Sequence, residues 1–385
     1  MIYLDNASTT PVDQRVIEAM LPYLKEQYGN PSTQYSLGRK AKDGVEKARR
    51  QVASLINATP EQIIFTSGGT EANNLALLGV AEYLKRINKT HIITSKIEHE
   101  SVLRSVQYLS NHGFTVDYIG VDTQGVIDIS TLESSITDAT GIVSIMYVNN
   151  ETGSVNPIEE IAKICSVHDI LFHTDCVQAL GSNIIDVFKI GCDLVSISSH
   201  KVHGVKGAGA LFVKNRRILS PIIYGGDGQE FGMRGGTEGV PLIVAFGEAC
   251  EIVKMNLRSI DIETSYVKQT FYQTLVRELK TYGLEQLCHI NGEPIVKHGK
   301  IINLRFDGID GETLLLMLDA KSVCVSSGSA CRSHENTPSR VLISMGLTED
   351  EARDSIRVSF SRMNTSEEVI RAAEIIAQCV KLLRD

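Results

Sequence analysis

Polar residues follow two apolar segments of the chain at positions where packing gives them no obvious role. ILFHTD (170–175) ends in Asp175, and DLVSIS (193–198) is followed by His200 and Lys201. In open α/β sheets, ligands bind outside the carboxyl ends of the strands. Chemistry with pyridoxal phosphate (PLP) requires a lysine that forms a Schiff base and a carboxylate that keeps a pyridine nitrogen protonated. Each residue alone is more simply a surface lysine or a helix N-cap, but their joint occurrence favours a PLP site.

A glycine-rich turn earlier in the chain could hold the phosphate group of such a cofactor. Residues 63–75 read IIFTSGGTEANNL, an apolar segment followed by two glycines and a helical pattern. Glycine allows a tight turn, and the amides at a helix N-terminus bind anions. Gly69 and Thr70 are therefore candidate phosphate contacts, and Ser198 and His200 could add donors. By itself the turn is more typical of a capped helix start, and it lacks the GxGxxG and GK[ST] patterns.

The segments that position these residues alternate with helical patterns through the first two-thirds of the chain. Their short length and apolar character predict strands buried on both faces. We therefore expect an α/β fold with a large, mostly parallel seven-stranded sheet flanked by helices. The predicted strands are 63–66, 91–95, 114–120, 142–148, 170–175, 193–198 and 209–213.

A long helical region, from Thr237 to about residue 281, leads into a second pattern of the α+β kind. The predicted elements are a strand at 300–306, a helix at 311–320 and a strand at 356–361, followed by a final amphipathic helix. This change predicts a large domain of residues 15–255 and a smaller one of 1–14 plus 256–385. We expect the first dozen residues to pack beside the smaller domain, which also carries a polar loop at about 325–338.

Bulk properties exclude several classes of protein. The 385 residues carry a net charge of -8, so the chain lacks the basic footprint of nucleic-acid binders, and no direct nucleic-acid contact is expected. No stretch approaches about 18 uninterrupted apolar residues. The first residues are unlike a secretory signal, so no membrane contact is expected either. The eight cysteines are scattered without CxxC pairs, which disfavours a disulfide framework or a metal site and predicts a reducing cytoplasm.

A series of ordered motifs along essentially the whole chain carries a resemblance to one family. The motifs are YLDNASTTPVD, YGNPS, FTSGGTEANNLAL, HIITSKIEHESVL, VSIMYVNNETG, FHTDCVQALG, SISSHKVHGVKGAGAL, MRGGT, SSGSAC and IRVSF. They are similar to the NifS/IscS type of cysteine desulfurases, PLP enzymes of the aspartate aminotransferase-like fold (fold type I). The resemblance implies conversion of L-cysteine to L-alanine, with the sulfur carried as a persulfide on Cys331 and then passed to an acceptor protein.

The resemblance implies a role for each matched residue near the cofactor. Lys201 resembles the Schiff-base lysine, which also removes the substrate α-proton. Asp175 matches the carboxylate at the pyridinium nitrogen. His99 matches the imidazole that stacks on the ring, and it is the candidate to move the substrate thiol proton. The other matches are contacts of the phosphate and of the ring hydroxyl: Gly69, Thr70, Asn150, Gln178, Ser198 and His200.

Further matches imply how the substrate and a second subunit are bound. Arg357 matches the arginine that pairs with the substrate carboxylate, and Asn30 matches a position near the same group. Cys331 lies in SSGSACRSHENTPS, where glycine, serine, asparagine and proline are typical of an exposed loop. Thr237 matches a threonine that reaches the phosphate of the neighbouring subunit's cofactor, which implies a homodimer.

Several positions depart from the family pattern. Cys176 stands where the family usually has a smaller residue, and we assign Cys176 only a packing role. Val205 stands where the family commonly has proline. Phe231 and Glu238 also depart from the family pattern, and they leave the expected subunit contact of Thr237 open. By its spacing, Lys206 is a rival candidate for the Schiff-base lysine. The remaining cysteines are expected to be small buried hydrophobes: Cys165, Cys192, Cys250, Cys324 and Cys379.

Two alternative functions stay open at this point. One is another PLP enzyme of this fold, such as a selenocysteine lyase, an aminotransferase or a kynureninase-like hydrolase. The other is a non-catalytic scaffold that only binds PLP. The sulfur acceptor is open as well: iron–sulfur assembly, tRNA thiolation and DNA phosphorothioation are the routes that the family serves. The departures near Cys331 make the last route a hypothesis.

Overall fold

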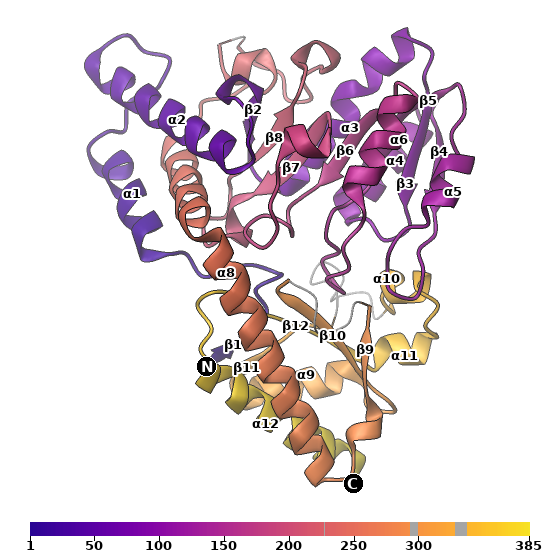
Figure 1. Ribbon diagram of the computed structural model, residues 1–385. Helices are drawn as coiled ribbons and strands as arrows, with labels where there is room; N and C mark the ends of the chain where they lie inside the picture. The colour runs from indigo at the N-terminus through magenta and orange to yellow at the C-terminus, as the bar shows by residue number, and fades with distance from the viewer. Residues whose placement is uncertain (227, 293–298, 328–336) are drawn as a thin grey trace.

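Seven strands form the central sheet in the upper lobe of the computed structural model (Figure 1). The structure describes residues 1–226, 228–292, 299–327 and 337–385. In the order in which they pair, the strands are β2 (Ile63–Thr66), β8 (Gly209–Val213), β7 (Leu194–Ser198), β6 (Leu171–Asp175), β5 (Thr140–Ser144), β3 (His91–Ser95) and β4 (Thr115–Ile119). β8 is antiparallel to both of its neighbours, and all other pairs are parallel. The predicted sheet is confirmed, and the carboxyl ends of β2, β6 and β7 lie at the same edge.

Both faces of this sheet are covered by helices, because successive side chains of one strand enter different cores. Ile63 and Phe65 pack with the core that contains α2 (Ser36–Leu55), whereas Ile64 packs with the core on the opposite face. The first core also holds α6 (Ile158–Val167), and the second holds α3 (Gly69–Arg86) and α4 (Glu100–Ser110). Burial on both faces explains why the strands read as uniformly apolar segments.

One helix, α8 (Val240–Thr281), runs through both lobes (Figure 1). Its 42 residues span roughly 60 Å at 1.5 Å per residue. Buried residues up to Ile260 belong to the core of the upper lobe, and those from Val267 onward belong to the core of the lower lobe. The long helix predicted after Thr237 is therefore confirmed.

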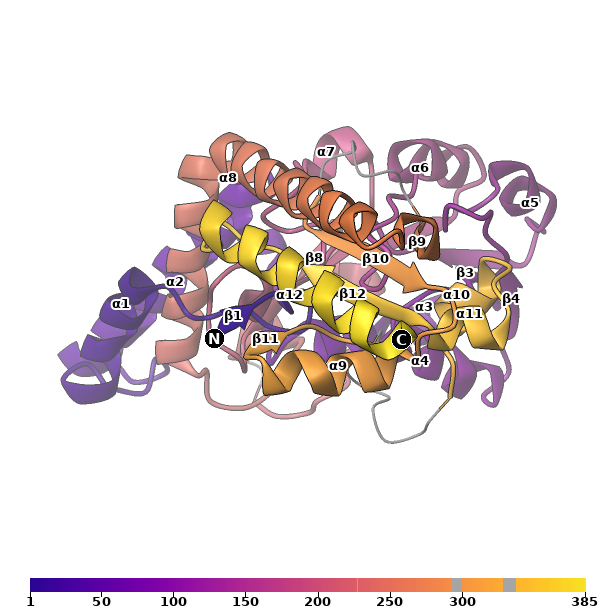
Figure 2. The ribbon, with the colours of Figure 1, turned by 90° about the horizontal axis from the view of Figure 1, so that it is seen from below.

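The lower lobe contains a small antiparallel sheet, in the order β12 (Ser355–Ser359), β10 (Ile301–Phe306) and β9 (Cys288–Asn291). Seen from below, α9 (Gly311–Ala320), α12 (Ser366–Arg384) and the end of α8 lie beside one another across it (Figure 2). α12 begins at a capping box in which Thr365 and Glu368 bond each other's backbone N–H groups. Two short helices, α10 (Arg340–Ser344) and α11 (Glu349–Arg353), connect this lobe to the upper one.

The start of the chain belongs to the lower lobe, as expected. β1 (Ile2–Tyr3) pairs with β11 (Val323–Cys324), and Leu4 is buried in the core of the lower lobe. The boundary between the two hydrophobic cores lies within α8, between Ile260 and Val267. The division into residues 15–255 and 1–14 plus 256–385 stays our proposal for the domain organisation.

Some elements differ from the predictions or were not predicted. β5 ends at Ser144, four residues before the predicted end, because the chain there leaves the sheet and Met146 lines a cavity. α1 (Gln14–Lys25) and α2 were not predicted, nor were two short helices, α5 (Ile129–Ser134) and α7 (Val187–Ile190). Within the described ranges, no helix has both the length and the apolar character needed to cross a bilayer.

Candidate active site

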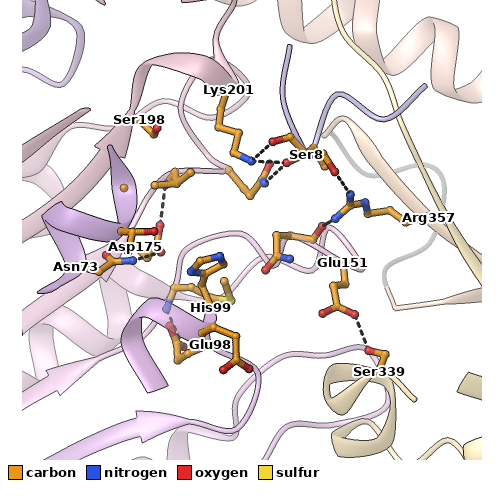
Figure 3. Close-up of a pocket in the computed structure, with 18 of the residues that line it drawn as sticks. Ser8, Asn73, Glu98, His99, Glu151, Asp175, Ser198, Lys201, Ser339 and Arg357 are labelled. Atoms are coloured by element: carbon orange, nitrogen blue, oxygen red, sulfur yellow. Dashed lines mark hydrogen bonds between the residues drawn. The ribbon is translucent and has the colours of Figure 1, made fainter. Parts of the chain in front are cut away.

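A cavity of about 290 Å³ lies at the carboxyl edge of the large sheet and is lined by residues of both lobes (Figure 3). This volume is at the lower end of the range for small-molecule sites. Most site residues predicted from the sequence line it: Gly69, Thr70, His99, Asn150, Asp175, Gln178, Ser198, His200, Lys201 and Arg357. Asn30 and Thr237 are exposed and do not line it, and Cys331 lies outside the described residues.

One end of the cavity is suited to an anion. α3 begins at Gly69 directly after β2, and no side chain of the described residues caps its first amides. A Cβ on Gly69 would lie 2.7 Å from Val177 Cγ2, so this close packing needs a glycine. Ser198 Oγ lies nearby, buried and without a hydrogen-bond partner in the described part of the chain. An unpaired hydroxyl beside an uncapped helix N-terminus is what a phosphate group would satisfy.

The negative charge of Glu71, in the first turn of α3, is directed away from this end. Its carboxylate pairs with Arg234 at 2.9 Å and accepts a hydrogen bond from the Ser67 N–H at 2.9 Å. The pair leaves the helix end without a competing unpaired carboxylate. Arg234 lies 163 positions further along the chain, and the sequence did not indicate this pair.

Asp175, the last residue of β6, is held by two donors. Its Oδ2 accepts from Asn73 Nδ2 at 2.7 Å, and its Oδ1 accepts from the Val177 N–H at 2.9 Å. Asp175 is 5% exposed and Asn73 is 1% exposed. Sequence reasoning missed Asn73, although its place one turn into α3, facing the site, could have indicated it.

Lys201 lies just beyond β7, in the short 3₁₀ turn Ser199–Lys201. Its Nζ donates to the backbone oxygens of Ala7 at 2.6 Å and Ser8 at 2.7 Å (Figure 3). Lys206, the rival lysine, is exposed and does not line the cavity. The N-terminal segment thus holds the amine, a contact that the sequence did not suggest.

A second lysine is buried behind Lys201. Lys300 is 8% exposed and lies with Lys201 around a small secondary cavity. Burial, and then the charge of Lys201, lower the pKa of Lys300 to about 7. Burial, and then the charges of three lysines, lower the pKa of His200 to about 4, so its ring is neutral at physiological pH. Burial and nearby positive charge thus favour the neutral forms of the two basic groups beside Lys201. Lys300 was not predicted.

Arg357, in β12, is 2% exposed and already has several partners. Its Nη2 donates to Asp5 Oδ1 at 2.7 Å and to Ser8 Oγ at 2.8 Å, and its Nη1 donates to the Asn150 backbone oxygen at 2.8 Å. Its Nε has no hydrogen-bond partner among the described residues. Of the five guanidinium N–H groups, Nε–H and one Nη1–H are not used by these bonds, and they lie on different sides of the group, so each could add one separate hydrogen bond.

Glu98 lies beside His99 and also lines the cavity. Ser95 Oγ donates to its Oε1 at 2.6 Å, and the Met146 N–H donates to the same oxygen at 3.0 Å. Burial raises the pKa of this carboxyl group to about 8, so it is mostly protonated at neutral pH. Glu98 was not predicted as a site residue.

The described residues on either side of 328–336 lie at the cavity. Ser327 and Thr337, which flank the undescribed residues, both line the cavity. Just beyond, Ser339 Oγ donates to Glu151 Oε2 at 2.5 Å, and Arg340 Nη2 donates to the Glu98 backbone oxygen at 2.9 Å. These bonds tie the end of the segment to the upper lobe.

The other cysteines were mostly predicted correctly. Cys176 is fully buried and does not line the cavity, and burial raises the pKa of its thiol well above the usual value. Cys165, Cys192, Cys250 and Cys379 are buried as expected. Cys324 is half-buried instead, because β11 lies beside the two-residue strand β1 at the edge of the lower lobe.

The loop that leads to Thr237 is fixed by a buried ion pair. Arg49 donates from both terminal nitrogens to the Glu230 carboxylate, at 2.8 and 2.9 Å, and the Phe65 N–H donates to the same group. Glu230 and Phe231 both have positive φ, 41° and 59°, which non-glycine residues adopt at a cost. The strained turn is held by these buried bonds.

The fold and the site together define a class of protein. A model of the family described as aminotransferase class-V matches residues 2–371, and the chain belongs to that family, whose members use PLP. Cysteine desulfurase IscS of Methanosarcina thermophila is 41% identical over 384 residues, which cover 100% of this chain and 93% of the relative. A solved NifS-like protein has a TM-score of 0.89 at 35% identity, covering 99% of this chain and 100% of its own. A structure of SspA in complex with cysteine has a TM-score of 0.79 at 34% identity, covering 95% and 100%.

Proposed function

We propose that the protein is a PLP-dependent cysteine desulfurase that converts L-cysteine to L-alanine and holds the sulfur as a persulfide on Cys331. The observation that carries the proposal is a single cavity that joins a lysine, a carboxylate, an anion-binding helix end and a buried arginine. Similarity over the whole chain to proteins named cysteine desulfurases supports the substrate.

The residues around the cavity fit PLP. The unpaired Ser198 Oγ and the start of α3 suit the phosphate, and the Asp175 carboxylate can accept a hydrogen bond from a protonated ring nitrogen. Lys201 is the proposed attachment point. The other proposed contacts are Gly69, Thr70, His99, Asn150, Gln178 and His200. When bound, PLP supplies an electron sink for negative charge at the substrate α-carbon.

The chain's own residues bind and orient the substrate. Arg357 is the proposed partner of its carboxylate, while Asp5 and Ser8 keep the guanidinium in place. Lys201, once released from the carbonyls of Ala7 and Ser8, takes the proton from the substrate α-carbon. Asn30 stays a proposed contact of the substrate carboxylate, although it is exposed on its own chain.

Sulfur transfer requires a nucleophile, and we assign this role to Cys331. Its thiolate attacks the sulfur of the bound cysteine, and a sulfur–sulfur bond forms as the carbon–sulfur bond breaks. The electron pair left on carbon takes a proton and gives the methyl group of alanine, so no external oxidant or reductant is needed. The positions of Ser327 and Thr337 on the cavity support this role.

We further propose a homodimer in which Thr237 meets the cofactor phosphate of the other subunit, because this residue is exposed and lies outside its own cavity. The sulfur then passes to an acceptor protein of iron–sulfur assembly, tRNA thiolation or DNA phosphorothioation. The unpaired cysteines of the described chain support a reducing cytoplasm as the location.

The proposal is tested with purified protein, PLP and L-cysteine. We expect alanine to appear, and mass spectrometry of alkylated peptides to find the persulfide on Cys331. Cys331→Ala should keep bound PLP and lose the persulfide, whereas Cys324→Ala, which removes a half-buried thiol, should behave like the wild type.

The same assay separates the alternatives. Turnover of selenocysteine without turnover of cysteine would indicate a selenocysteine lyase. Amino transfer to a keto acid would indicate an aminotransferase, and absence of the yellow PLP colour would indicate a scaffold. Normal persulfide formation by the Cys331 variant would remove that residue from the mechanism.

A further inference from the structure

His99 is bound on one side by the beginning of its own helix. Its Nδ1 accepts a hydrogen bond from the Ser101 N–H at 3.1 Å, and Ser101 Oγ lies 2.7 Å from the same nitrogen. The ring therefore acts as the N-cap of α4. A backbone N–H can only donate, so this bond favours a lone pair on Nδ1 and a neutral ring that carries its proton on Nε2.

Asn73 fixes the direction of the remaining hydrogen bonds. Its Nδ2 donates one proton to Asp175 Oδ2 at 2.7 Å and the other to Ser101 Oγ at 2.8 Å. The amide oxygen could not take this place, because it would face a carboxylate. Since Ser101 Oγ accepts from Asn73, its own proton is directed to His99 Nδ1.

The hydrogen-bonded chain is shielded from water. Asn73 is 1% exposed, Asp175 5% and Ser101 7%. Exchange of these bonds for bonds to solvent is therefore costly. Both Asp175, on β6, and His99, at the start of α4, are held through one buried amide.

Charges of both signs face the same cavity as His99. The acidic groups are Glu98, Glu100, Glu151, Asp175 and Glu312, and the basic groups are His200, Lys201, Arg340 and Arg357. Glu98 is mostly protonated at neutral pH, and Glu100 pairs with Arg104 and Arg340 at 3.3 Å each. The lone pair at Nδ1 follows from its contacts with Ser101.

We propose that Asn73 and Ser101 are positioning residues that lock His99 as the neutral Nε2–H tautomer, so that it meets the substrate sulfur as a hydrogen-bond donor. This inference rests on the proposed function. A donor at the sulfur draws electron density from the atom that the Cys331 thiolate attacks. The thiol proton stays on that sulfur and does not pass to Nε2. The sequence predicted that His99 moves the proton of the substrate thiol. We propose instead that His99 donates a hydrogen bond to the same sulfur atom.

The tautomer can be read directly by NMR. In PLP-loaded protein labelled with ¹⁵N-histidine, ring nitrogen shifts distinguish a protonated nitrogen from an unprotonated one, and His99→Gln assigns the signal among the 10 histidines. We expect unprotonated Nδ1 and protonated Nε2, unchanged from about pH 6 to about pH 8, across the range in which an ordinary histidine titrates. An Nδ1–H ring, or a ring that titrates in this range, would overturn the proposal.

A pair of variants then tests the role of Ser101. Ser101→Ala removes the hydroxyl, so we expect a mixture of tautomers and a loss of about tenfold in kcat/KM for cysteine, with PLP binding unchanged. Ser101→Thr keeps the hydroxyl and should retain the wild-type tautomer and pH profile. Identical NMR signals and pH profiles for the Ala variant and the wild type would contradict the assignment.

The NMR result is independent of turnover. If the wild type gives no alanine from cysteine, the proposed function fails, while the ring nitrogen shifts still decide whether the hydrogen-bonded chain fixes the tautomer. If alanine forms and the ring is protonated on Nδ1, the function stands and the inference fails.

Discussion

Arg357 donates an Nη2 hydrogen bond to the hydroxyl group of Ser8 at 2.8 Å. The backbone oxygen of the same serine accepts from Lys201 Nζ at 2.7 Å. One residue of the N-terminal segment therefore sits between the proposed substrate-binding cation and the proposed cofactor-binding amine. The relative position of these two groups depends on how the first residues of the chain dock against both lobes.

The first prediction concerns Arg357. Arg357→Lys keeps a positive charge but loses the planar group that can pair with a carboxylate through two N–H groups. We expect KM for cysteine to rise about 10- to 100-fold, with a smaller change in kcat. Steady-state kinetics on PLP-saturated protein measure this, and an unchanged KM would mean that the substrate carboxylate binds elsewhere.

The second prediction separates the two candidate lysines. Lys201→Ala should abolish turnover and leave PLP unattached, because no other lysine of the described residues lines the main cavity. Lys206→Ala should retain both properties, since Lys206 is exposed. Borohydride reduction followed by peptide mapping locates the labelled lysine, and a label on Lys206 would reverse the assignment.

The third prediction uses the buried amine of Lys300. Its pKa of about 7 in the folded protein lies below the usual value of 10.5, so between these values the unfolded chain binds more protons than the folded one. The free energy of unfolding attributable to Lys300 therefore rises with pH across this window, and the full penalty is present below pH 7.

Lys300→Met should remove this penalty. We expect the variant to be more stable than the wild type by on the order of 2–4 kcal/mol near pH 6, with a smaller difference near pH 10. Urea unfolding at both pH values, with excess PLP, measures the effect. A difference that does not depend on pH would show that folding does not lower the pKa of Lys300.

The fourth prediction concerns the ion pair that holds the strained turn before Thr237. Glu230→Gln leaves the Arg49 charge buried between Phe65 and Phe231, over whose rings it lies at 4.8 and 5.0 Å. We expect a loss of about 3–5 kcal/mol in the free energy of unfolding. Glu46→Gln is the matched control, because Glu46 also pairs with Arg49 but is 41% exposed, and it should cost less than about 1 kcal/mol. Equal losses of unfolding free energy in the two variants would contradict the argument that burial makes the Glu230 pair the stronger one.

The sheet and the residues at its strand ends could be predicted from the sequence because both follow local rules. Strands buried on both faces read as apolar segments, and five of them, β2, β3, β6, β7 and β8, end at the predicted residue. Asp175 and Lys201 were found because each follows such a segment directly. α2 was missed, since its buried face is made largely of glycine and alanine, which give little hydrophobic signal.

The residues that hold the site together could not be predicted in the same way. Asn73 contacts Asp175 across 102 positions and Arg49 contacts Glu230 across 181, and no local pattern reports such pairs. Lys300 has the sequence signature of a surface lysine, and its burial follows from the packing beside it of α8 and of residues 360–362, which follow β12. These contacts depend on tertiary structure, which the spacing of residue types does not encode.

The helix α8 contributes large apolar side chains to the interiors of both lobes, among them Phe246 in one and Phe271 in the other. Loss of either interior would leave half of this helix without its packing partners, which is unfavourable because isolated helical turns are only marginally stable in water. The two lobes therefore form one cooperative unit in denaturation, and calorimetry of the protein should record a single transition.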